Sequence, residues 1–175
     1  MNIIDHLKVH LVREHHLEPV EQVTFPEIRI IRNAGLEFVG TGKTWGSILS
    51  VALVLADSIT EERMASLSET FFSFTHSLRK YAGRMPPIPL IGTKLGSFGL
   101  LCFVFEREPD SKLITFIQKQ KHGSAWSQDY CLSWILDVHN ARVYRHDGLP
   151  LKMPPGEEYF RGLLYEYQVA LSSGR

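Results

Sequence analysis

Two histidines and a glutamate near the start of the chain have the residue types and the spacing of metal ligands. His6, His10 and Glu14 recur every four residues, so on a helix they would line one edge. A histidine pair at this spacing can bind zinc, but a zinc site needs three or four ligands. Because neither an HExxH motif nor a cysteine pair accompanies them, we interpret these residues as a solvated helix face and predict no bound metal.

Acidic and basic side chains gather around a short polar break between two apolar runs. They are Glu106, Glu108, Asp110, Lys119 and Lys121. Carboxylates that hold Mg²⁺ beside a lysine that stabilises an attacking hydroxide are the parts of a metal-dependent nuclease. The grouping resembles nucleases of the PD-(D/E)xK type, in which the lysine stands two residues after Glu or Gln. Here Gln118 is followed at that distance by Gln120, so the motif is broken. We favour the charged rim of a hairpin over 106–122 and keep a nuclease as an alternative.

A second group of residues mixes cations with aromatic rings, as platforms for single-stranded nucleic acids do. It comprises Lys119, Lys121, His122, Trp126, Arg142, Tyr144 and His146. The last three alternate along the chain, so in a strand they would share one face. These residues form the predicted binding surface. Lys plus Arg and Asp plus Glu both number 19, and this neutral balance disfavours nucleic acid as the partner.

Two further patterns imitate catalytic motifs without completing them. Residues 40–44 read Gly-Thr-Gly-Lys-Thr, but a phosphate-binding loop needs a glycine where Glu37 stands, so we predict a turn between two strands. Asp137 and His139 would share a strand face, as a base and its orienting carboxylate do. No serine or cysteine nucleophile can be placed beside them, so we interpret them as part of a turn.

The composition is typical of a folded protein in a reducing compartment. The 175 residues suit one domain over 1–175, and 44% hydrophobic with 22% charged residues is near the globular norm. Cys102 and Cys131 lie in apolar runs, which favours buried free thiols over a disulfide. The first residues lack the features of a signal peptide, and the longest apolar run, 48–56, is far too short to span a membrane. We therefore expect a cytoplasmic protein with no membrane segment.

Hydrophobic periodicity predicts three helices, over 2–15, about 58–82 and 157–171. Phe71 and Phe74 belong to a stripe spaced by three and four residues, so both are predicted to lie in the core. The pattern of a capping box makes Ser58 the predicted N-cap of the long helix.

The last predicted helix has an apolar stripe that ends at Leu171. On its exposed side, Glu157 and Arg161 are predicted to form an i,i+4 ion pair.

Runs of alternating or continuous apolar residues predict two or three strands before the long helix and four after it. They cover 27–32, 36–39, 48–56, 98–106, 112–121, 130–138 and 142–146. The alternation is cleanest over 130–138, where five apolar side chains from Tyr130 to Val138 share one face.

The order of the elements predicts a single α+β domain. We expect a mostly antiparallel sheet with the long helix and the N- and C-terminal helices packed on one of its faces. This order resembles that of secretion-chaperone-like and profilin-like domains. The resemblance is one of topology, so it transfers no functional residue.

The sequence favours a non-catalytic protein-interaction or regulatory domain that acts through a protein partner or self-association, including a possible dimer. Two alternatives stay open. One is a nuclease or nucleic-acid binder that uses the 106–122 hairpin, and the other is a small-ligand binder with a pocket between the long helix and the sheet. No cofactor is predicted.

Overall fold

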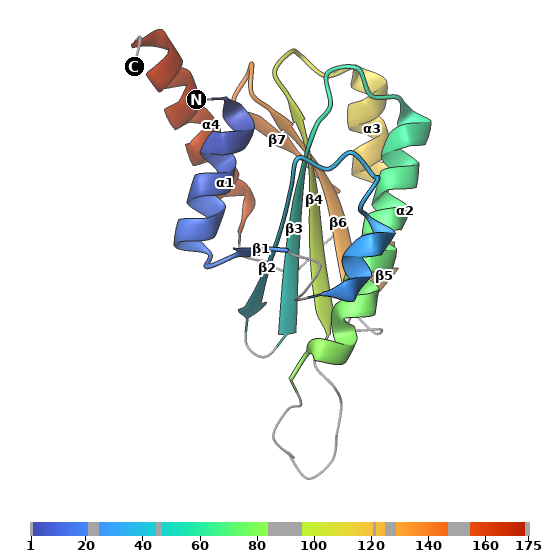
Figure 1. Cartoon of the computed structure of the whole chain (residues 1–175). Helices are drawn as coiled ribbons and strands as arrows, with labels where there is room; N and C mark the ends of the chain where they lie inside the picture. Colours follow the sequence, from blue (N-terminus) through green and yellow to red (C-terminus); the bar gives the residue numbers. More distant parts are fainter. Residues whose placement is uncertain are drawn as a thin grey trace.

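A seven-stranded mixed sheet runs through the molecule, and helices cover both of its faces (Figure 1). The computed structural model describes residues 2–20, 25–44, 47–83, 96–120, 122–124, 129–146 and 155–173. The strands are β1 (Glu18–Pro19), β2 (Phe38–Thr44), β3 (Ser47–Leu55), β4 (Ser97–Phe105), β5 (His122–Ser124), β6 (Asp129–Asp137) and β7 (Arg142–Tyr144). They lie in the order β1-β2-β3-β4-β6-β5, with β7 also paired to β6.

The centre of the sheet is parallel, so the prediction of a mostly antiparallel sheet is wrong. β3 pairs parallel with β4, and β4 pairs parallel with β6. Only the outer strands pair antiparallel: β1 with β2, β2 with β3, and β5 and β7 with β6. Parallel neighbours need long crossover connections, and two helices supply them here. They are α2 (Glu61–Ser77), between β3 and β4, and α3 (Ser111–Lys119), between β4 and β6.

The crossover helices pack on one face of the sheet over a core of large side chains. The stripe that predicted the long helix runs from Met64 to Tyr81, and it is buried as far as Leu78, just past the end of α2, whereas Tyr81 is 37% exposed. Phe71 and Phe74 are both 0% exposed. The sheet contributes Leu101, Phe103 and Ile135 to the same core. The core positions of Phe71 and Phe74 are therefore confirmed.

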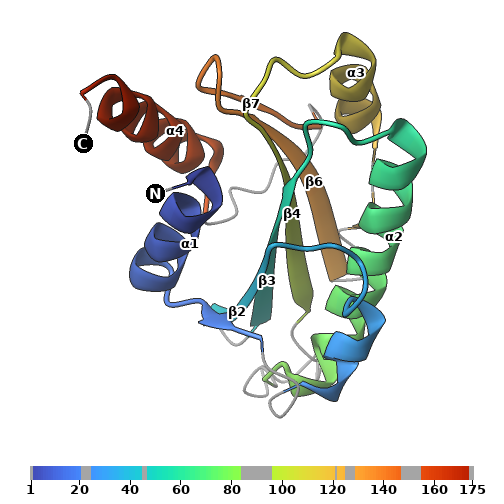
Figure 2. The same ribbon diagram turned by 45° about the horizontal axis from the view of Figure 1, so that its top comes forward.

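The opposite face of the sheet is covered by α1 (Ile3–Glu14) and α4 (Glu157–Ser172), which lie side by side (Figure 2). The predicted alternation in β6 is confirmed, because all five side chains from Tyr130 to Val138 lie in this second core. They meet Leu7 and Leu11 of α1 and Phe160 of α4. The molecule thus has three layers, with α1 and α4 on the face that α2 and α3 leave free. The expectation that the helices pack on one face is wrong, because parallel crossovers bring α2 and α3 to one face while the other still needs cover.

The segment 112–121 is predicted as a strand, but its residues up to Lys119 form the helix α3, and Lys121 lies outside the described residues. Its isoleucines and threonine favour strands locally, but the Asp110 carboxylate caps the helix by accepting a hydrogen bond from the Lys112 amide at 2.8 Å. Packing of Ile117 beneath the helix, at 0% exposed, then outweighs the local preference. The predicted hairpin over 106–122 therefore does not exist.

Two other local predictions are corrected at helix starts. Residues 27–32 do not form a strand, because Pro26 opens a 3₁₀ helix, η1 (Pro26–Ile30), and its ring fixes a helical φ. The N-cap of α2 is Thr60 rather than Ser58, and its hydroxyl accepts a hydrogen bond from the Arg63 amide at 3.3 Å. A second 3₁₀ helix, η2 (Leu78–Tyr81), follows α2.

Two details of the C-terminal helix also differ from expectation. Arg161 pairs with Glu158, three residues away, at 3.1 Å, and the predicted partner Glu157 instead binds Arg145 at 2.6 Å. Leu171 is 61% exposed, because the last turn of α4 continues the apolar stripe beyond the sheet that buries the rest of it.

The two cysteines are free and buried, as predicted. They lie in different cores, Cys102 on the α1–α4 side of the sheet and Cys131 on the α2–α3 side. Burial raises the pKa of both thiols, so both stay protonated at neutral pH. Each helix within the described residues is too short or too polar to cross a bilayer.

Candidate functional site

Two hollows lie between α2 and α3 beside the carboxyl ends of the parallel strands. Figure 1 shows the two helices at the upper right. One hollow, of about 430 Å³, extends from the end of β4 to the first turns of both helices, and includes Asp57, Glu62, Phe105 and Glu108. A second hollow, of about 460 Å³, continues along α3 past Thr115 and Phe116 to Lys119 and Gln120. Because both hollows are lined by Glu61 and Lys112, they form one feature, which we call the α2–α3 groove.

Charge is distributed unevenly along the α2–α3 groove. Its end at the strands is predominantly acidic, because five carboxylates line it against two cations, Arg107 and Lys112. The carboxylates are those of Asp57, Glu61, Glu62, Glu108 and Asp110. The far end carries Lys119 beside the uncharged Thr115 and Phe116. The groove therefore favours a cationic group at one end and an anionic group at the other.

Two of the acidic side chains at the strand end are held by backbone amides. The Asp57 carboxylate accepts hydrogen bonds from the amides of Glu106 at 2.9 Å and Arg107 at 3.1 Å, which ties the end of β3 to the end of β4. Asp110 caps α3. These carboxylates are thus fixed in position before any ligand arrives, which lowers the entropic cost of binding.

The predicted binding surface is only partly assembled. Lys119 is exposed and lines the groove, whereas Arg142 is exposed on β7 at the edge of the sheet. Tyr144 is half-buried against the core under α2 and α3, on the same sheet face as its partner Ile135. Lys121 and Trp126 lie outside the described residues, and of His122 only its backbone in β5 is described.

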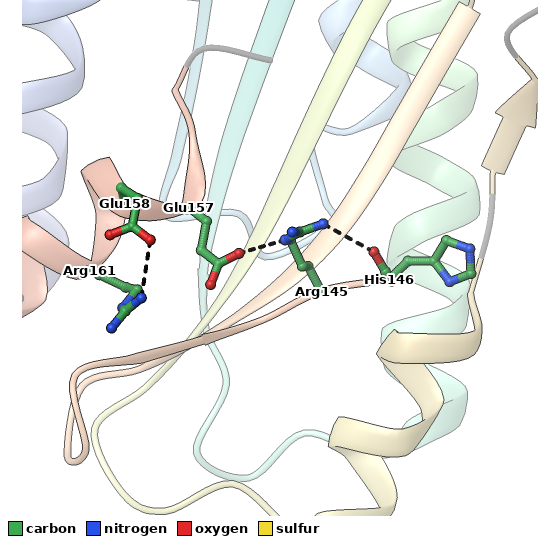
Figure 3. A network of polar contacts seen from close by, with 5 residues as sticks. All are labelled: Arg145, His146, Glu157, Glu158 and Arg161. Carbon is green, nitrogen blue, oxygen red and sulfur yellow. Dashed lines mark hydrogen bonds and ion pairs between the residues drawn. The ribbon is translucent and has the colours of Figure 1, made fainter. Parts of the chain in front are cut away.

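His146 serves as a link between elements rather than as part of an open face. Its Nδ1 lies 2.5 Å from the carbonyl oxygen of Gln118 in the last turn of α3. The neighbouring Arg145 binds Glu157 at the start of α4 and reaches the His146 carbonyl oxygen at 3.4 Å (Figure 3). The chain after β7 is thereby fastened to α3 on one side of the sheet and to α4 on the other.

The two sequence patterns that resemble catalytic motifs form a strand and a turn instead. Residues 40–44 lie in β2 and pair with β3, so they form neither a phosphate-binding loop nor the turn that we predicted. Asp137 is fully buried, and its carboxylate accepts hydrogen bonds from the backbone amide and the side chain of Asn140. These hydrogen bonds close the turn from β6 to β7, and His139 in that turn is exposed. The interpretation of Asp137 and His139 as part of a turn is therefore confirmed.

The three predicted metal candidates on α1 do not share a solvated face. His6 is 7% exposed, and its Nε2 lies 3.1 Å from the Leu163 carbonyl oxygen of α4. His10 Nδ1 contacts the Glu14 carboxylate at 2.9 Å. Burial, together with the nearby His10, lowers the pKa of His6. The surface of α1 that carries His6 therefore packs against α4.

Sequence reasoning missed most of the α2–α3 groove. Lys112, Thr115 and Phe116 were assigned to a strand, whose alternation would have placed them differently. The signal that finds them is the cap residue Asp110 followed by Leu113 and Ile117 at helical spacing.

Comparisons with protein-family models, curated proteins and solved structures find no match for this chain. The fold and the site define an α+β domain of three layers with a charged groove at the carboxyl ends of its parallel strands.

Proposed function

We propose that this chain is a non-catalytic regulatory domain that binds a small zwitterionic ligand in the α2–α3 groove. The single observation that carries the proposal is the groove itself, because sheets with parallel strands bind ligands outside the carboxyl ends of those strands. Each hollow has the size of an ordinary ligand pocket, about 300–1,000 Å³.

The side chains of the groove define the chemistry of this ligand. A cationic group would lie at the strand end near Glu62 and Glu108, and an anionic group would meet Lys119. Between them, the half-buried Phe116 ring offers an apolar surface. An amino-acid-like or dipeptide-like compound carries a cationic group, an anionic group and an apolar part, so it matches all three parts of the groove.

The buried free thiols support a cytoplasmic location, since a reducing compartment keeps such thiols in the reduced form. The first function that the sequence favoured, a protein-interaction domain, stays a second candidate. It is supported by the outer surface of α4, where Tyr165 and Val169 are 63% and 45% exposed.

A substitution on α3 tests the groove without touching the core. Thr115 is exposed, and arginine favours helices, so Thr115→Arg should leave the fold intact while its side chain fills the groove. We expect thermal-shift screening of amino acids and dipeptides to find a zwitterion that raises the Tm of the chain. Its affinity, measured by calorimetry, should fall at least about tenfold in Thr115→Arg, a loss of roughly 1.4 kcal/mol.

Ser172→Arg is the matched control, because it adds the same charge to the exposed last turn of α4. Ser172→Arg should bind the same compound with the affinity of the unmodified chain. The proposal fails if no zwitterion raises the Tm, or if Thr115→Arg and Ser172→Arg bind equally well.

A further inference from the structure

A cluster of three possible metal ligands lies between α1 and α4, away from the α2–α3 groove. His6 and His10 come from successive turns of α1, and Glu166 comes from α4. One ligand atom from each lies within 4.8 Å of the other two. The two helices lie side by side on their face of the sheet, so the cluster joins the two ends of the chain (Figure 2).

Hydrogen bonds leave one nitrogen of each imidazole with a free lone pair. A carbonyl oxygen only accepts, so His6 Nε2 must donate its proton to Leu163, which leaves Nδ1 unprotonated in the neutral ring. The Glu14 carboxylate likewise accepts from His10 Nδ1, which leaves Nε2 unprotonated. Histidines that bind metals are oriented in this way, by a carbonyl or a carboxylate on the other nitrogen.

The surroundings of the cluster differ on its two sides. The His6 ring is buried and lies beside the Tyr167 ring, with centroids 5.5 Å apart. Glu166 is exposed, so solvent reaches the cluster from the α4 side. A metal held there would keep a position open for water, as three-ligand zinc sites do.

We propose that His6, His10 and Glu166 bind one Zn²⁺ ion, with water as the fourth ligand. Two imidazoles and a carboxylate suit zinc, whereas Mg²⁺ prefers oxygen ligands alone. Zinc bonds of about 2.0–2.1 Å hold ligand atoms roughly 3.4 Å apart, so the more exposed His10 and Glu166 must move inward by about 1 Å. Since the ion is bonded to both helices, it clamps α4 to α1.

Titration of the untagged chain with ZnCl₂ after chelator treatment tests this site. We expect calorimetry to find one Zn²⁺ per chain and saturating zinc to raise the Tm by roughly 5 °C, with no rise in MgCl₂. Co²⁺ should give the visible absorption of a four-coordinate site. Both Glu166→Gln and His10→Ala should weaken zinc binding at least about tenfold.

Two matched variants control for the loss of an acid or an imidazole elsewhere. Glu158→Gln alters another exposed glutamate of α4, and His139→Ala removes an exposed histidine from the β6–β7 turn. Both should bind zinc as the unmodified chain does. The proposal is overturned if the chain binds no zinc, or if Glu166→Gln and His10→Ala bind it as tightly as the two controls do.

Discussion

Replacing Phe71 with alanine is expected to lower the free energy of unfolding by about 3–5 kcal/mol. The Phe71 side chain is 0% exposed at the centre of α2, and its ring lies 6.0 Å from that of Phe74, which is equally buried. Removing the ring leaves a cavity between α2 and the sheet that neighbouring side chains cannot fill without leaving their own positions. Urea unfolding followed by circular dichroism measures the change.

Tyr165→Ala is the control for Phe71→Ala, because it removes an aromatic ring that is 63% exposed on α4. Its effect should stay within about 0.5 kcal/mol. A loss below about 1 kcal/mol for Phe71→Ala would mean that α2 faces the sheet with a different side.

Adding a single methyl group at Gly99 is expected to destabilise the protein by about 1–3 kcal/mol. Gly99 lies in β4 on the face that α2 covers. A Cβ atom at this position would lie 2.6 Å from Thr75 Oγ1 and 3.1 Å from both Cys131 Sγ and a Phe71 ring carbon. Those contacts are too short, so α2 must shift away from β4 and lose packing.

A double-mutant cycle separates this steric cause from a change in strand preference. Thr75→Ala removes the closest atom, so Gly99→Ala should cost at least about 1 kcal/mol less in that background. Gly162→Ala is the matched control, because a Cβ atom there meets nothing within 4 Å on the exposed side of α4. It should raise stability by about 0.5–1 kcal/mol. Equal costs for Gly99→Ala with and without Thr75 would exclude the proposed clash.

The parts of the fold that could be predicted are those where one strong local signal decides the structure. The spacing of Phe71 and Phe74 identified α2, and the alternation from Tyr130 to Val138 identified β6 and its buried face. Both patterns are predictive because the apolar side chains of each element must lie on the side that faces the core.

The pairing of the strands could not be predicted in the same way. The residues within 98–106 and 130–138 do not reveal that these two segments are parallel neighbours. The direction of their pairing depends on whether the element between them is a strand or a crossover helix. That element, 112–121, is rich in β-branched residues and was read as a strand. With α3 assigned as a helix, the parallel order of β4 and β6 follows directly.

The two candidate sites differ in how much of each the sequence revealed. His6, His10 and Glu14 have the spacing of metal ligands, but without further ligands nearby in the sequence we interpreted them as a solvated helix face. The third member of the cluster, Glu166, lies more than 150 residues away from them in the sequence. For the groove, the sequence singled out Glu108, Asp110 and Lys119, but as the charged rim of a hairpin. Its other lining residues come together only when α3 packs beside α2.

The most direct test of the central claim, that the α2–α3 groove is the binding site, is a ¹H–¹⁵N NMR titration of the chain with the zwitterion found by thermal shift. We expect the largest amide shifts at Glu62 and Glu108 in the hollow at the strand end, and at Thr115, Phe116 and Lys119 in the hollow along α3. Shifts concentrated instead on α4 around Tyr165 and Val169, with the groove unchanged, would contradict the claim.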